Sequence, residues 1–93
     1  MQIRSIMCCC GSGLGSSMIV SMNVERVLNK LGIKGVSVEH TSLSEANENT
    51  ADLFVVGKDL GPQVINWNCE KIILDQLMDM NELETKIKSV FGL

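Results

Sequence analysis

A cysteine followed by glycines and serines carries the clearest chemical potential in this 93-residue chain. Cys10 ends an apolar run, and the apolar spacing further along is typical of an amphipathic helix, so we expect the thiol where a strand ends and a helix begins. Backbone amides at a helix N-terminus favour anions. The anion is a thiolate, a phosphate, or a phosphoryl group carried on the thiol. The expected phosphate-binding residues are Gly11, Ser12, Gly13, Leu14, Gly15, Ser16 and Ser17.

The thiol must ionise before it can act as a nucleophile. A free cysteine has a pKa of about 8.5, so only a few per cent is thiolate at neutral pH. A helix dipole contributes ~0.3–1 kcal/mol, whereas one pKa unit corresponds to ~1.4 kcal/mol. Several direct N–H···S contacts are therefore needed, and glycines permit them because they allow close backbone approach.

Two apolar residues beside the loop are candidates for docking a partner. We expect Leu14 and Met18 to stand exposed, where an apolar rim would bind another protein and exclude water. The alternative places Leu14 in the core, and Met18 and Met22 as core fillers. For Ser16 and Ser17, the alternative to phosphate binding is a role as helix N-caps.

Nucleotide chemistry does not fit the loop. Gly11, Gly13 and Gly15 follow the spacing G-x-G-x-G, whereas a dinucleotide-binding loop needs G-x-G-x-x-G. A Walker A loop needs a lysine after its glycines, and no lysine precedes Lys30. We therefore expect neither a dinucleotide cofactor nor nucleotide hydrolysis.

The cysteine pattern fits neither redox exchange nor zinc binding. Cys8, Cys9 and Cys10 are consecutive, and the chain has no Cys-x-x-Cys pair. Cys69 and the single histidine, His40, do not complete a zinc ligand pattern. We expect no metal, no cofactor and reduced thiols. His40 is expected at the surface at a strand end, and the alternative is that it steers phosphate from the neighbouring loop.

Apolar patterning predicts the elements that must position the loop. Strands are expected over residues 3–9, 36–40, 52–56 and 71–74, and helices over 16–31, within 59–66 and over 81–91. Asn81 with Glu84 resembles a capping box at the start of the last helix. Alternating strands and helices predict an α/β fold with a small open four-stranded parallel sheet and helices on both faces, similar to flavodoxin-like and Rossmann-like three-layer folds.

Composition supports one small domain over residues 1–93. Apolar residues make up 45% of the chain and aromatic residues only 3%, so the core must be aliphatic. The net charge is −3 and the 8 basic residues are scattered, which argues against nucleic acid as a partner. No stretch reaches the ~18 apolar residues that cross a bilayer, and no signal segment precedes the first strand. We expect a cytoplasmic protein.

A cysteine phosphatase is the main enzymatic alternative. Small phosphatases of this kind also place a thiolate at the end of a first parallel strand, within the pattern Cys-x5-Arg-Ser/Thr. Here Ser16 stands six residues after Cys10, where the arginine would be. Without the guanidinium fork, the charge of the transition state is not clamped and hydrolysis should be slow. The loop is then expected to hold a phosphoryl group and pass it on.

The run from Cys10 to Val20 resembles the phosphorylation loop of IIB components of bacterial sugar phosphotransferase systems (PTS), closest to the ascorbate and galactitol branch. Chain length and element order agree over essentially the whole chain. The resemblance implies that Cys10 takes a phosphoryl group from a phosphohistidine of the IIA component. It also implies transfer to a sugar in the membrane component IIC, through which the protein would associate with the inner face of the membrane. Ascorbate is the first expected sugar, with galactitol or another pentitol or hexitol next. The alternatives are a low-molecular-weight cysteine phosphatase-like enzyme and a degenerate anion-binding module.

Overall fold

The computed structural model describes residues 3–9 and 14–93. Its strands and helices follow the predicted alternation along the chain. In chain order they are β1 (Ser5–Cys9), α1 (Leu14–Leu31), β2 (Ser37–Thr41), the 3-10 turn η1 (Leu43–Glu45), β3 (Leu53–Gly57), α2 (Gly61–Val64), β4 (Glu70–Leu74) and α3 (Met80–Phe91). The turn η1 lies between β2 and β3.

The four strands form one parallel sheet in the order β2-β1-β3-β4, which confirms the predicted fold class. β1 lies between two neighbours, and its last described residue, Cys9, is opposite Thr41 of β2 and Val56 of β3. The chain leaves β1 towards β2 on one side and later crosses to β3 on the other. The boundary between β1 and β3 is therefore the switch point of the topology, where open α/β sheets place their ligands.

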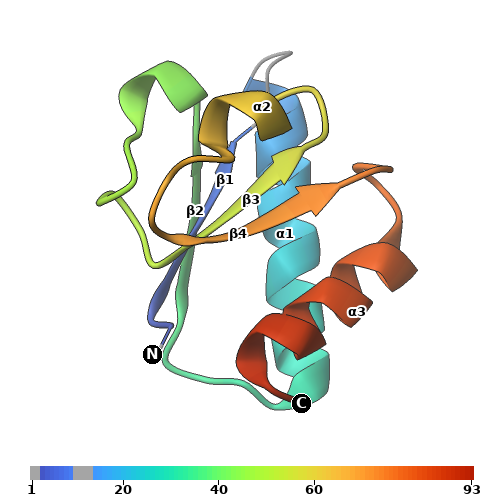
Figure 1. Cartoon of the computed structure of the whole chain (residues 1–93). Helices are drawn as coiled ribbons and strands as arrows, with labels where there is room; N and C mark the ends of the chain where they lie inside the picture. The colour runs from blue at the N-terminus through green and yellow to red at the C-terminus, as the bar shows by residue number, and fades with distance from the viewer. Residues whose placement is uncertain (1–2, 10–13) are drawn as a thin grey trace.

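The two faces of the sheet are covered unequally (Figure 1). Ile6 and Cys8 of β1 belong to a core cluster with side chains from the long helices α1 and α3. Met7 and Cys9 belong to a second cluster with side chains from the short helix α2 and the segments around it. Alternate residues of β1 thus face opposite layers, as the period of a strand requires. The predicted layers on both faces are confirmed.

Both long helices differ in detail from their predicted limits. α1 begins at Leu14, two residues before the expected start, so Gly15 belongs to its first turn. The predicted capping box at Asn81 is wrong, because α3 begins at Met80 and Asp79 is its N-cap. The Asp79 carboxylate accepts hydrogen bonds from the Asn81 amide at 2.9 Å and the Glu82 amide at 3.1 Å.

Residues on the buried side of each helix hold it against the sheet. Val24 and Val27 of α1 and Leu83 and Ile87 of α3 are all at most 2% exposed and belong to one core cluster. Over the described part of the chain, no helix is both long enough and apolar enough to span a bilayer.

Candidate functional site

The expected site lies at the carboxyl edge of the sheet, between β1 and α1. β1 ends at Cys9, and α1 begins at Leu14. The connection between them follows the central strand at the switch point of the topology. The predicted site residues Cys10, Gly11, Ser12 and Gly13 fall in that connection and lie outside the described residues.

The amino-terminal first turn of α1 lies at this edge of the sheet. Leu14, Gly15 and Ser16 occupy the first three helical positions, where backbone N–H groups have no acceptor within the helix. The turn carries no acidic side chain, so nothing within it offsets the positive end of the helix dipole. First-turn amides without a helical acceptor are what an anion site needs, and phosphate binding by these residues stays a prediction. The side chains of Leu14 and Gly15 lie outside what is described.

Ser17 is buried inside α1 and does not cap it. Its residue is 1% exposed, and it occupies the fourth helical position, so the alternative of an N-cap is wrong for Ser17. Ser16, half-buried in the third position, is likewise inside the helix and not its N-cap. An N-cap has non-helical backbone and precedes the first helical residue, which is Leu14 here.

His40, on the neighbouring strand β2, contacts Ser17 of α1. It is exposed on β2 and pairs in register with Cys8 of β1. Its Nδ1 atom lies 3.4 Å from the Ser17 Oγ atom. The predicted surface position of His40 is confirmed, whereas its contact with Ser17 of α1 was not predicted. The pattern of residues gave no sign of that contact, because it depends on the register of β2 beside β1.

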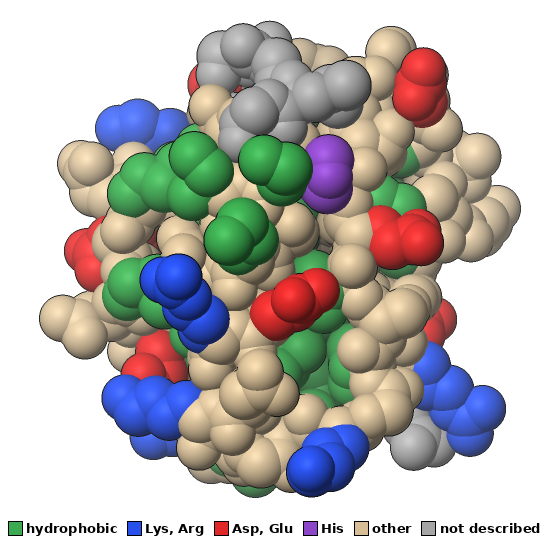
Figure 2. Space-filling model, turned by 180° about the vertical axis from the view of Figure 1, so that it is seen from behind, with side chains coloured by type: hydrophobic (Ala, Val, Ile, Leu, Met, Phe, Trp, Pro, Cys, Tyr) green, Lys and Arg blue, Asp and Glu red, His purple; other side chains and the backbone are tan. Residues whose placement is uncertain are grey.

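Apolar side chains on the outer side of α1 lie close to this edge. Met18, Ile19 and Met22 are 48%, 45% and 48% exposed, and we call these three residues the α1 patch. Figure 2 shows hydrophobic side chains gathered on this face, next to the histidine. The expected exposure of Met18 is confirmed, whereas the alternative role of Met18 and Met22 as core fillers is wrong. The exposure of Ile19 was not predicted, although Ile19 falls outside the helical spacing of apolar residues that predicts the buried side of α1.

Burial disfavours ionisation of two of the described thiols, Cys8 and Cys69. Cys8 is fully buried, and burial, followed by the neighbouring Cys9 and by Glu25, raises its pKa from 9.0 to about 12. Burial is also the main cause that raises the pKa of Cys69 above its ordinary value. Cys8 and Cys69 form no disulfide within the described part of the chain. Cys8 and Cys69 are therefore poorly suited to nucleophilic chemistry.

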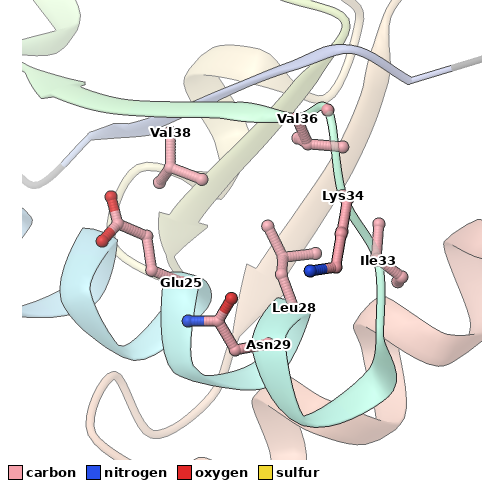
Figure 3. A pocket seen from close by; sticks show the side chains of 8 residues that line it. Glu25, Leu28, Asn29, Ile33, Lys34, Val36 and Val38 are labelled. Atoms are coloured by element: carbon pink, nitrogen blue, oxygen red, sulfur yellow. The ribbon is translucent and has the colours of Figure 1, made fainter.

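A surface cavity elsewhere is separate from this edge. It has a volume of about 320 Å³ and lies between α1 and the amino-terminal part of β2, where Glu25 and Leu28 face Val36 and Val38 (Figure 3). The β2 residue that lines this cavity, Val38, comes before His40 in the strand. Neither Ser17 nor His40 lines the cavity. Within residues 3–9 and 14–93, no three His, Cys, Asp or Glu side chains are grouped as a metal site would require.

Comparisons with known proteins match almost the whole of this fold. The profile of the family described as "PTS system, Lactose/Cellobiose specific IIB subunit" matches residues 5–89, from the start of β1 to the last turns of α3. A curated relative, the "Ascorbate-specific PTS system EIIB component" of Mycoplasma pneumoniae, is 30% identical over 89 residues. That alignment covers 91% of this chain and 92% of the relative.

Proposed function

The chain belongs to the family of PTS IIB subunits and is a sugar phosphotransfer component, and from this premise we propose that Cys10 is the residue that carries the phosphoryl group. The group would come from a phosphohistidine of a IIA component and go to a sugar bound in a membrane IIC component. The protein would thus work at the inner face of the membrane.

The proposed transfer has two substitution steps at phosphorus. In the first, the Cys10 thiolate attacks the phosphohistidine of IIA, the S–P bond forms, the N–P bond breaks, and the imidazole leaves with the electron pair. In the second, a sugar hydroxyl attacks the phosphocysteine, the O–P bond forms and the thiolate leaves. The hydroxyl proton goes to a base on the sugar-binding side. Catalysis of such steps is mostly positioning and charge stabilisation.

The observation that carries the proposal is the placement of α1 after the central strand. Leu14, Gly15 and Ser16 are the first three residues of α1, whose amides have no acceptor within the helix, and α1 follows β1 at the switch point of the sheet. The proposed phosphate-binding residues 11–17 include these three positions. A thiol beside them would be stabilised as thiolate, whereas Cys8 is buried with its pKa near 12.

The α1 patch supports a docking role at the same edge. Protein interfaces concentrate their binding energy in a few desolvated apolar or aromatic side chains. Met18, Ile19 and Met22 offer such side chains in the first half of α1. We propose that the patch, together with Leu14, contacts the IIA donor during transfer.

The proposed sugar is ascorbate. Support for it is the name of the Mycoplasma pneumoniae relative, which aligns along nearly the full length of both chains. Galactitol and other pentitols or hexitols are the alternatives. The IIC component would enclose the sugar, so a transport assay has to include it.

One experiment separates a carrier from a phosphatase. The protein is loaded from phosphoenolpyruvate, the general phosphotransfer proteins and a IIA component, and its intact mass and the release of inorganic phosphate are followed together. A carrier gains one phosphoryl group, releases phosphate slowly, and transfers the group when vesicles containing IIC and ascorbate are added. Rapid, sustained release of phosphate would instead favour the phosphatase, and a bound anion with no mass increase would favour an anion-binding module.

A further inference from the structure

We propose that His40 is a positioning residue for phosphoryl transfer and acts by orienting the hydroxyl of Ser17. This inference rests on the function proposed above. His40 and Ser17 come from different elements, β2 and α1, and meet with 3.4 Å between Nδ1 and Oγ. Ser17 is the fourth residue of α1 and directly follows Leu14, Gly15 and Ser16, whose amides would bind the phosphoryl group in the proposed function.

The hydroxyl of Ser17 has one proton and several possible acceptors. Ser21, one turn further along α1 and also buried, donates its proton to the Met18 carbonyl at 2.7 Å. Such a bond inside the helix is the common arrangement for a serine in a helix. Ser17 differs from Ser21 in that its hydroxyl contacts a side chain of another element, His40 of β2, which allows β2 to influence where the hydroxyl proton points.

The direction of the hydrogen bond decides the effect. When the Nδ1–H group of His40 donates to Ser17 Oγ, the oxygen accepts and its own proton is released towards another acceptor. A thiolate or phosphoryl oxygen at the amino end of α1 is such an acceptor, and charge-assisted hydrogen bonds are the stronger kind. The imidazole would then serve transfer without touching the reacting atoms.

The exposure of His40 and the length of its contact with Ser17 indicate that His40 acts in transfer more than in folding. His40 is exposed, and a 3.4 Å contact is long for a hydrogen bond, so its net contribution to stability is small. Ser17, in contrast, is 1% exposed. Catalytic hydrogen bonds are often long in the free enzyme and tighten when substrate is present.

A double-mutant cycle tests the pathway from His40 through Ser17. Single-turnover transfer from saturating phosphorylated IIA is measured for Ser17→Ala, His40→Ala and the double variant. Each single variant should slow transfer by roughly tenfold or more, as loss of one oriented donor does. The double variant should be no slower than Ser17→Ala, because two residues that act as one unit are not additive. Multiplicative losses, or transfer at the wild-type rate in His40→Ala, would overturn the proposal.

Two further variants and one spectrum separate positioning from general damage. His40→Asn places an N–H donor where Nδ1 was and should restore most of the rate, whereas His40→Gln reaches the Nε2 position and should not. Ser21→Ala, a matched change one turn along, should transfer within twofold of wild type, with an unchanged far-ultraviolet circular dichroism melt. The ¹⁵N spectrum of the neutral imidazole should show a protonated Nδ1, and a bare Nδ1 would overturn the donor assignment.

The same measurements distinguish failure of this inference from failure of the proposed function. A wild-type protein that gains no phosphoryl group from IIA overturns both. A wild-type protein that is phosphorylated, together with His40→Gln and His40→Ala variants that transfer at the same rate as wild type, overturns only the role of His40.

Discussion

Met18 and Met22 lie one turn apart on the outer side of α1, and each is 48% exposed. Val24 and Val27, on the opposite side of the same helix, are buried in the core between α1 and the sheet. Methionine is adaptable in packing and is used at surfaces that accept protein partners. An apolar pair at this position, in the first half of α1, is therefore a contact surface that can be tested.

Charged substitutions in the α1 patch should weaken transfer from IIA. Met18→Asp and Met22→Asp place a carboxylate where a partner would cover an apolar side chain, and loss of a central contact costs more than about 1 kcal/mol of binding. We expect a tenfold or larger fall in kcat/KM for phosphorylated IIA, with kcat little changed. Initial rates of transfer over a range of concentrations of phosphorylated IIA give both kcat/KM and kcat.

The matched control for the patch is Ile65→Asp. Ile65 is 57% exposed and follows α2, on the other face of the sheet from α1. It should leave kcat/KM unchanged, and all three variants should unfold within about 0.5 kcal/mol of wild type. An equal loss for Ile65→Asp would mean that added negative charge, and not the patch, weakens the reaction.

The cap of α3 makes a prediction about stability. Asp79→Ala removes the side chain that accepts from the Asn81 and Glu82 amides and should lower the free energy of unfolding by about 1 kcal/mol. Asn81→Ala should be nearly neutral, although the sequence pattern assigned the cap to Asn81. Urea unfolding of the two variants compares them directly, and a larger loss for Asn81→Ala would contradict the observed cap.

Apolar patterning was enough to predict the sheet and its layers, but not the details of the helix ends. β1 and β3 are short apolar runs buried on both faces, which is a strong signal in sequence. β2, whose residues are exposed or half-buried, was predicted from its alternation of apolar and polar residues. The start of α1 was missed because a glycine-rich segment reads as a loop, whereas Gly15 is helical here. Asp79 with Glu82 has the same spacing as Asn81 with Glu84, so only the position of the loop after β4 decides which pair begins the helix.

Glu82 makes stability depend on pH. Its carboxylate accepts hydrogen bonds from Lys86 at 2.7 Å and from the backbone amides of Asp75 and Gln76 at 2.7 and 2.9 Å. These bonds, that from Lys86 first, lower the pKa of Glu82 from 4.5 to about 2. The ionised form is thus favoured in the folded state, so its stabilising effect is complete above about pH 4.5 and is lost as pH falls through about 2.

Glu82→Gln checks this dependence. At pH 7 the variant should unfold at lower denaturant concentration than wild type, because the neutral amide binds the Lys86 ammonium and the loop amides less strongly. The difference in unfolding denaturant concentration between wild type and Glu82→Gln should narrow steadily as the pH falls from 4.5 to 2. Unfolding curves at intervals of pH measure it, and a gap that widens on acidification would contradict the assignment.

Buried Cys8 should resist alkylation in the folded protein. With a pKa of about 12, its thiolate fraction at pH 7 is on the order of 10⁻⁵. Iodoacetamide should leave Cys8 unmodified under native conditions and modify it in denaturant, as peptide mass mapping will report. Modification of Cys8 at the same rate in both conditions would contradict its burial.

The candidate site shows a similar division between pattern and tertiary structure. The resemblance at Cys10 and the glycine-serine segment identified the family and the position of the loop relative to strand and helix. The exposure of Ile19 and Met22 follows from the rotation of α1 on the sheet, because the buried side is already filled by valines. The contact between Ser17 and His40 requires β2 to lie beside β1 in the observed register, and no local pattern specifies it.

The most direct measurement is the location of the phosphoryl group after loading from IIA. The phosphorylated protein is digested under conditions that preserve phosphothiol bonds, and the peptides are sequenced by mass spectrometry, with Cys10→Ser and Cys69→Ser proteins in parallel. We predict one phosphoryl group on Cys10, none in the Cys10→Ser protein, and unchanged loading in the Cys69→Ser protein. A phosphoryl group on another residue, or undiminished loading of Cys10→Ser, would contradict the account.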